Sequence, residues 1–232
     1  MFIGRETELD GLNSSYKKDS FQFPVIYGRR RVGKTTLINK FIQGKKAVYF
    51  VAIESTIREN LRLLSSQILS VLAPDAPKNP FQSFSEAVEY IFEKARHERI
   101  VFVIDEYPYL ASSDKSVSSI LQAAIDKHQA NSKLFLILCG SSMSFMETQV
   151  LGYESPLYGR RTSQYKILPF DYLTSAKMHP NYRNEEKITI YGITGGIPEY
   201  LSRIDAELTV FENARNCSLT RQGVCSKSPP VC

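Results

Sequence analysis

A glycine-rich segment close to the N-terminus has the spacing of a phosphate-binding loop. Residues 28–35 fit the pattern G-x-x-x-x-G-K-[ST], between an apolar run and a helical pattern. In such a loop the backbone N–H groups and the start of the helix face the anion. We expect Lys34 to reach the outer phosphates and the Thr35 hydroxyl to ligate Mg²⁺. The other positions predicted to border the phosphates are Gly28, Arg29, Arg30, Arg31, Val32, Gly33 and Thr36.

The three consecutive arginines of this loop, residues 29–31, allow more than one interpretation. They can form a solvated basic loop without a further role. They can also add positive potential near the phosphates, or meet an acidic partner or nucleic acid. Three arginines are too few to predict DNA binding.

A second chemical feature is a pair of carboxylates that follows an apolar run. Residues 100–104 are all apolar, and Asp105 and Glu106 come directly after them. We expect Asp105 to hold Mg²⁺ and Glu106 to polarise an attacking water as general base. The pair favours hydrolysis over transfer to a small molecule. Because no guanine-reading N-K-x-D pattern occurs, ATP is favoured over GTP.

A third polar position follows another apolar run, residues 134–138. Ser141 is predicted to bond the attacking water or the γ-phosphate, and the alternative is that serine here caps the next short helix. Cys139 is expected to be a small buried hydrophobe. His97, His128 and His179 have no partners at metal-ligand spacing and are expected at the surface.

The elements that must position these residues alternate between strands and helices. Continuous apolar runs are typical of parallel strands that helices bury on both faces. The sequence therefore predicts a three-layer α/β domain through about residue 170, followed by a smaller helical segment over 171–213. The expected strands are 23–27, 47–53, 100–104, 134–138 and 164–168. The expected helices include 56–72, 83–96, which has a capping-box start, and 117–128.

The composition is that of a globular protein. The chain has 232 residues, of which 43% are hydrophobic and 23% charged, and a net charge of +5. These values exclude disorder, collagen and coiled coil. No apolar run approaches ~20 residues and the start has no signal-peptide pattern, so we expect a cytoplasmic protein without a membrane span. Residues 1–50 carry a net charge of +6, from ten Lys or Arg and four Asp or Glu.

The order of several motifs resembles one known family. The motifs are residues 2–6, the loop 28–35, the pair Asp105-Glu106, residues 157–161, and residues 195–201. Together they resemble the archaeal-type ATPases of the STAND branch of P-loop ATPases, which are related to the AAA+ class. The likeness covers residues 1 to about 213. It implies a parallel sheet of the additional-strand (ASCE) type, ATP hydrolysis that drives a conformational switch, and a helical lid.

The resemblance also implies roles for residues outside the phosphate loop. Phe2, Ile3 and Arg5 would border the adenine and sugar, and Pro198 would pack against the adenine. Arg160 or Arg161 would approach the γ-phosphate, in the same or a neighbouring subunit. Simpler alternatives stay open. Arg5 and Glu6 can form a surface ion pair, residues 195–196 can be a helix C-cap, and residues 160–161 can cover a solvated turn.

Residues 214–232 depart from the family pattern, because they show no helical or strand period. Three of the four cysteines, Cys217, Cys225 and Cys232, fall here. Displacing plausible codons by one base recovers the Leu-Phe-Glu-Glu-Pro expected in the family, so we hypothesise a frameshift near residues 213–217. A divergent disordered tail is the alternative. The cysteine spacing is poor for zinc.

Three functions are therefore compared. The first is an ATP-hydrolysing switch, which can self-associate or act on a protein partner. The second is a non-catalytic ATP-binding module or an inert truncated fragment. The third is a DNA-associated, initiator-like ATPase that acts through a winged helix, most of which this chain lacks.

Overall fold

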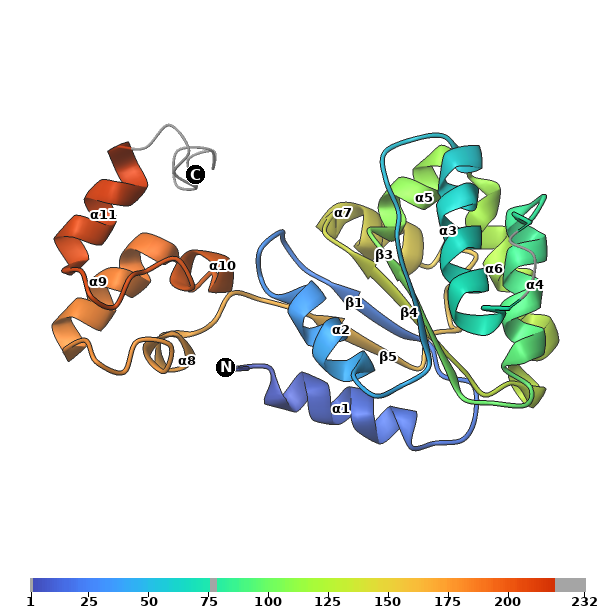
Figure 1. The fold of residues 1–232 in the computed structure, drawn as a ribbon, viewed down its shortest axis with the longest axis horizontal. Helices are drawn as coiled ribbons and strands as arrows, with labels where there is room; N and C mark the ends of the chain where they lie inside the picture. The colour runs from blue at the N-terminus through green and yellow to red at the C-terminus, as the bar shows by residue number, and fades with distance from the viewer. Residues whose placement is uncertain (1, 76–78, 220–232) are drawn as a thin grey trace. The chain divides into compact units, whose positions relative to one another are not determined.

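The computed structural model describes residues 2–75 and 79–219, and it contains a five-stranded parallel sheet (Figure 1). The strand order is β2-β3-β4-β1-β5, and every neighbouring pair is parallel. The strands are β1 (Pro24–Tyr27), β2 (Ala47–Val51), β3 (Ile100–Asp105), β4 (Leu134–Gly140) and β5 (Ser163–Lys166). Most of the tail for which the sequence suggests a frameshift, residues 220–232, lies outside the described residues.

Helices cover both faces of the sheet, and this is why its central strands are almost entirely apolar, with Asp105 at the end of β3 as the charged exception. Every residue of β1, β3 and β4 is buried. On one face, Phe41 of α2 packs against Phe135 of β4 at 5.1 Å between ring centroids, and Tyr16 of α1 packs against both rings. The other face carries the larger core, formed with α3, α4 and α6. The predicted three-layer α/β fold with a parallel sheet is confirmed.

The helices around this sheet follow the strands in alternation. They are α1 (Glu6–Tyr16), α2 (Lys34–Ile42), α3 (Ile57–Leu72), α4 (Phe84–Lys94), α5 (Tyr107–Ser113), α6 (Ser116–His128), the 3₁₀-helix η1 (Gln129–Asn131), α7 (Met143–Phe145) and the π-helix η2 (Met146–Val150). Among the described residues, no helix combines the length and apolar character needed to cross a bilayer.

A second compact unit gathers residues 168–219 with two short pieces of the N-terminal half, residues 2–6 and 30–33. Its helices are α8 (Tyr172–Ala176), α9 (Asn184–Thr194), α10 (Pro198–Leu201) and α11 (Val210–Leu219). They pack around Phe170, Tyr182, Ile190 and Leu201. Helix α11 extends through residues 214–219, where the sequence pattern indicated no regular structure; neither glycine nor proline interrupts it.

Two of the three histidines expected at the surface are buried instead. His128 is 2% exposed, its Nε2 lies 2.8 Å from Glu89 Oε2, and its ring stacks on Phe92. His179 is 6% exposed and packs edge-on against Tyr182, and burial lowers the pKa of its imidazole. An imidazole can enter a core when aromatic rings and a polar partner surround it. The described residues contain no cluster of three or more metal-ligating side chains.

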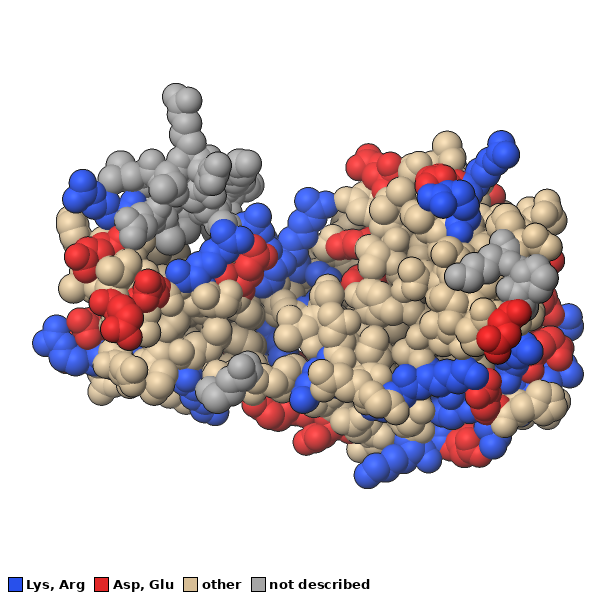
Figure 2. Space-filling view, viewed as in Figure 1, with Lys and Arg blue, Asp and Glu red and all other residues tan. Residues whose placement is uncertain are grey.

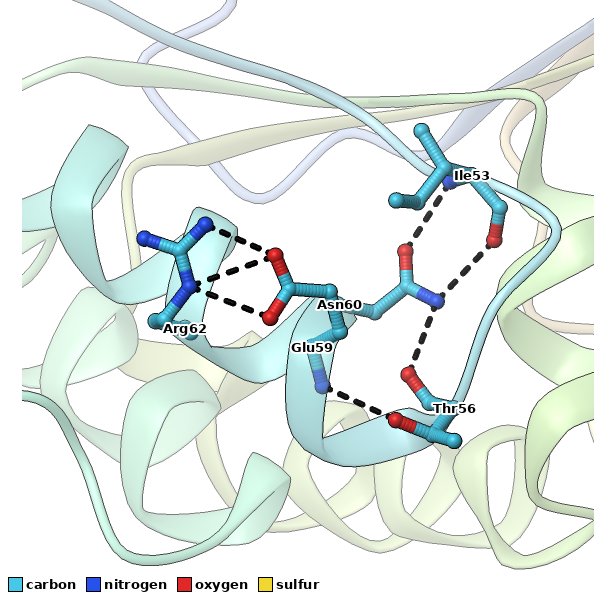
Figure 3. A network of polar contacts seen from close by, with 5 residues as sticks. All are labelled: Ile53, Thr56, Glu59, Asn60 and Arg62. Carbon is cyan, nitrogen blue, oxygen red and sulfur yellow. Dashed lines mark hydrogen bonds and ion pairs between the residues drawn. The ribbon is translucent and has the colours of Figure 1, made fainter.

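The chain that leaves β2 is held by one buried amide side chain (Figure 3). Asn60 of α3 is fully buried. Its Oδ1 accepts the Ile53 N–H at 3.0 Å, and its Nδ2 donates to the carbonyls of Ile53 and Thr56 at 3.0 and 3.2 Å. Thr56 also caps α3, because its hydroxyl accepts the Glu59 N–H. A single residue thus fixes the loop at the carboxyl end of the edge strand.

We predict that Asn60→Ala lowers the free energy of unfolding by about 1–3 kcal/mol, because it removes the three hydrogen bonds that the buried Asn60 amide makes to the backbone of Ile53 and Thr56. Arg62→Ala is the matched control in the same helix. It removes only the exposed pair with Glu59, at 2.7 Å, and should leave stability nearly unchanged. Urea unfolding followed by circular dichroism compares the two variants, and equal losses would contradict the structural role of Asn60.

Candidate functional site

The glycine-rich loop connects the end of β1 to the start of α2, as the motif requires. Gly28 approaches β5 so closely that a Cβ there would lie 2.2 Å from the carbonyl oxygen of Ile167. Gly33 has a φ of +92°, a conformation that side chains rarely adopt. Both glycines of the pattern are therefore demanded by the backbone path. The amides of the first turn of α2 have no acceptor within the helix, and these are the groups that a phosphate-binding loop presents.

Lys34 is the buried charge of this loop, with 6% exposure. Its ammonium donates to the carbonyl oxygens of Gly28 at 2.8 Å and Arg29 at 2.9 Å. These bonds satisfy a charge that would otherwise be costly to bury. They also hold the ammonium against the loop backbone, at the position where a cation can exchange carbonyl partners for phosphate oxygens.

The arginines of the loop are exposed, as are Thr35 and Thr36, whereas Val32 is fully buried. Arg31 adopts a left-handed conformation with φ of 71°, and its guanidinium donates to the Tyr200 hydroxyl at 3.1 Å. It also lies 3.5 Å from the Glu199 carboxylate, and the Glu199 N–H donates to the Arg31 carbonyl. Arg31 is thus exposed and has partners in residues 199–200, and its role at the phosphates stays a prediction.

Asp105 ends β3 and is 5% exposed. Its Oδ2 accepts the hydroxyl of Thr35 at 3.4 Å and that of Tyr49 at 2.5 Å, and its Oδ1 accepts the Glu106 N–H at 2.9 Å. The structure thus brings Thr35 and Asp105 together, as predicted from their positions after two different strands. A hydroxyl and a carboxylate are oxygen ligands of the kind that Mg²⁺ prefers, so this pair fits that ion.

Tyr49 is the residue of this cluster that the sequence did not reveal, because it stands inside an apolar strand and belongs to no motif. Burial, and then the hydrogen bond to Asp105, raise the pKa of the Tyr49 phenol above its ordinary value. Cys139 is fully buried, as predicted. Burial first, and then the negative charge of Asp105, raise the pKa of its thiol, which therefore stays protonated.

Glu106 points to a different partner from its neighbour Asp105. Its backbone is left-handed, with φ of 50°, at the residue that begins α5. Its Oε2 accepts two bonds from Ser141, one from the N–H at 3.2 Å and one from the hydroxyl at 2.9 Å. The N-cap position of α7 belongs to Ser142. Ser141 therefore orients the predicted base, and strained backbone such as that of Glu106 is common at functional sites.

The two arginines before β5 have different environments. Arg160 makes a two-pronged pair with Asp126 at 2.7 and 2.6 Å, which lowers the pKa of that carboxyl, and it also donates to the carbonyls of Pro156 and Tyr158. Arg161 lies over the Tyr158 ring, at 5.7 Å from its centroid. Its Nη1 is buried and has no hydrogen-bond partner within the described parts of the chain.

In the helical unit, Arg5 is buried rather than part of a surface ion pair. It is 8% exposed, and its Nη2 donates to the carbonyls of Val32, at 3.1 Å, and Leu168. Its guanidinium also lies 4.6 Å from the centre of the Phe170 ring. Phe2 and Ile3 in this N-terminal segment are half-buried. Through Arg5 the segment is attached to residues 30–33, which we call the loop apex.

The segment over residues 195–201 approaches the same loop apex. Gly195 is the C-cap of α9, as the simpler interpretation expected, with its N–H bonded to the Tyr191 carbonyl. Gly196 passes so close to Phe170 that a Cβ would lie 2.1 Å from its carbonyl oxygen. The Cγ of Pro198 is 3.9 Å from a Cβ built on Gly33. Proximity of Pro198 to the loop is thus a finding, and its contact with adenine stays a prediction.

Comparison with known proteins decides the family. A family model described as an ATPase domain predominantly from Archaea matches residues 2–204. The chain belongs to this family. An uncharacterized protein of Methanocaldococcus jannaschii is 35% identical over 204 residues. The match covers 88% of this chain but 44% of that relative, so the chain spans less than half the length of the relative.

Solved structures of other archaeal ATPases share the fold of this family member. A Walker-type ATPase of Pyrococcus abyssi has a TM-score of 0.69 at 19% identity, over 93% of this chain and 71% of that one. The ORC2 protein of Aeropyrum pernix, in ADPNP–ADP complexes, has a TM-score of 0.66 at 13% identity, over 93% and 69%. A STAND protein of Pyrococcus horikoshii reaches 0.56 at 17% identity, over 93% and 32%. The resemblance to P-loop ATPases is confirmed.

The surface charge of this ATPase domain is mixed. On the face shown in Figure 2, acidic and basic side chains are interspersed over the α/β unit. Two basic residues of the N-terminal region face carboxylates from elsewhere in the chain, Lys46 with Glu98 at 2.6 Å and Arg31 with Glu199 at 3.5 Å. The basic excess of the N-terminal region is thus partly balanced by acidic residues from elsewhere in the chain. It provides no argument for a nucleic-acid partner.

We predict that Arg5→Met lowers the free energy of unfolding by about 2 kcal/mol, because a charged donor to two carbonyls is lost from a buried position. The control is Arg183→Ala, which removes an exposed guanidinium of the same unit that pairs with Glu186. That control should unfold like the parent chain. Denaturant unfolding measures both variants, and a fully stable Arg5→Met would contradict the anchoring role.

Proposed function

We propose that this chain binds ATP and hydrolyses it in a Mg²⁺-dependent reaction that drives a conformational switch. The main support for this proposal is the contact between the Thr35 hydroxyl and the Asp105 carboxylate. Thr35 directly follows Lys34, whose buried ammonium lies in the glycine-rich loop. Parallel sheets bind ligands at the carboxyl ends of their strands, which is where these residues stand.

Binding follows from the charges and donors of the loop. The loop amides and Lys34 take the phosphate oxygens, and the ammonium leaves the carbonyls of Gly28 and Arg29 as it does so. Thr35 and Asp105 would hold Mg²⁺. When bound, this ion neutralises charge on the β- and γ-phosphates. Phe2, Ile3 and Pro198 are proposed to border the base, since their unit also contains the loop apex.

Hydrolysis needs a base that is held in place. We assign this role to Glu106, whose Oε2 accepts from Ser141, so that Oε1 would accept from the water. The oxygen of that water attacks the γ-phosphorus while its proton passes to Glu106, and the bond from γ-phosphorus to the bridging oxygen breaks to leave ADP and phosphate. This fixed base favours the catalytic function over the non-catalytic ATP-binding alternative.

The switch is supported by contacts between the loop apex and residues 199–200. Arg31 bonds to Glu199 and Tyr200, and Arg5 bonds to Val32. A phosphate that moves the loop backbone therefore changes contacts within the helical unit. Since a ligand shifts a conformation only through differential contacts, these bonds are the means by which ATP and ADP would be distinguished.

We predict that Lys34→Ala weakens ATP binding about 10- to 100-fold, because a charge-assisted contact is lost. Glu106→Gln should retain binding and lower turnover about 10²-fold or more, because its amide cannot accept the proton. Calorimetry with ATP and a phosphate-release assay measure the two effects. Turnover that survives Glu106→Gln would favour a different base, and binding without turnover in the parent chain would favour the non-catalytic module.

We also propose that Arg161, rather than Arg160, approaches the γ-phosphate, because the guanidinium of Arg160 is already committed to Asp126. Arg161→Ala is expected to lower turnover by about 10²-fold or more while ATP binding changes little. Arg160→Ala is the matched control and should keep its turnover. The same phosphate-release assay compares them, and the reverse pattern would assign the role to Arg160.

A further inference from the structure

The Asp105 carboxylate is fixed by donors from three different segments. The Glu106 N–H, from the same chain segment, holds Oδ1 at 2.9 Å. The Thr35 hydroxyl, from the start of α2, reaches Oδ2 at 3.4 Å. The Tyr49 phenol, from β2, reaches the same Oδ2 at 2.5 Å and makes the shortest of these bonds. The proposed function gives roles to Glu106 and Thr35 and none to Tyr49.

The sheet register explains how Tyr49 reaches this position. Tyr49 stands opposite Val103 and Val51 stands opposite Asp105 in the parallel pair of β2 and β3. Tyr49 is therefore a diagonal neighbour of Asp105 on the same face, a separation that a long aromatic side chain can span. The phenol therefore meets the same Asp105 oxygen that the Thr35 hydroxyl reaches.

Two donors on two different oxygens stop the carboxylate from rotating about its Cβ–Cγ bond. Without the phenol, Oδ2 would lose the shorter of its two hydroxyl contacts and keep the longer one, with Thr35 at 3.4 Å. The residues that hold a metal-binding carboxylate in place commonly change metal affinity by about 10- to 100-fold when they are removed. The geometry at Asp105 is of this kind.

We propose that Tyr49 is a positioning residue that orients Asp105 toward Thr35 and so sets the affinity of the nucleotide-bound site for Mg²⁺. This inference rests on the proposed function, because it assumes that Thr35 and Asp105 hold the ion. The new element is that Tyr49, a side chain of the edge strand β2, influences the affinity for Mg²⁺. Tyr49 acts through Asp105 and contacts no phosphate.

The test is Tyr49→Phe in the full chain, which keeps the ring and removes the hydroxyl. Binding of a fluorescent ADP analogue is titrated in EDTA and then at graded MgCl₂ concentrations. We expect the MgCl₂ concentration for half-maximal effect to rise about tenfold or more, whereas affinity in EDTA stays within about twofold. A general structural defect would weaken binding in both conditions. Tyr90→Phe, on α4 at the other face of the sheet, is the control and should match the parent.

A second Tyr49 variant and a double variant with Asp105 test whether the effect arises from the lost hydroxyl and acts through Asp105. Tyr49→Met removes the same donor with a different side chain and should shift the MgCl₂ requirement in the same direction. Combined with Asp105→Asn, the effect of Tyr49→Phe should largely disappear, because the two residues act through one carboxylate. An unchanged MgCl₂ requirement in both Tyr49 variants, or full additivity with Asp105→Asn, would overturn the inference.

Failure of the inference is distinguishable from failure of the proposed function. If the parent chain binds the analogue but both Tyr49 variants keep its MgCl₂ requirement, only the role of Tyr49 is lost. If the parent chain shows no Mg²⁺-dependent binding, the proposed function and the inference are overturned together.

Discussion

The burial of one ammonium group constrains the whole loop between β1 and α2. Lys34 is 6% exposed, and a buried cation needs oxygen atoms around it. The carbonyls of Gly28 and Arg29 supply them because the chain curls back over the start of α2. That path brings Gly28 against β5 and requires a left-handed Gly33. The same loop leads into α2, whose first-turn amides have no acceptor within the helix and can bind anions.

The parallel sheet then collects the other chemical groups at one edge. Since every strand runs in the same direction, the carboxyl ends of β1, β3 and β4 lie at the same edge of the sheet. Gly28 follows β1, Asp105 ends β3 and Ser141 follows β4. Asp105 and Glu106 leave β3 toward different partners, Thr35 with Tyr49 on one side and Ser141 on the other. Two adjacent carboxylates can therefore serve an ion and a water separately.

Two kinds of interaction stabilise the helical unit, an apolar core and polar contacts to the loop apex. Its small core of Phe170, Tyr182, Ile190 and Leu201 is supplemented by polar contacts to the loop apex. Arg5 donates to Val32, and residues 199–200 bond to Arg31. These residues come from both ends of the chain and meet at four residues of the loop.

The family-level fold and the motifs of the candidate site could be predicted from the sequence. The loop pattern, the apolar runs and the adjacent pair of carboxylates are encoded by contiguous residues, and contiguous residues can be read without knowing what lies across from them. The contacts of Tyr49, Arg5 and Ser141 became known only from the tertiary structure. Tyr49 bonds to a residue 56 positions away and Arg5 to one 163 positions away, so their contacts depend on strand register and chain return. An apolar pattern indicates that a strand is buried. It does not indicate that the Tyr49 hydroxyl of β2 will contact Asp105 of β3, because the register of two strands is set by packing between elements.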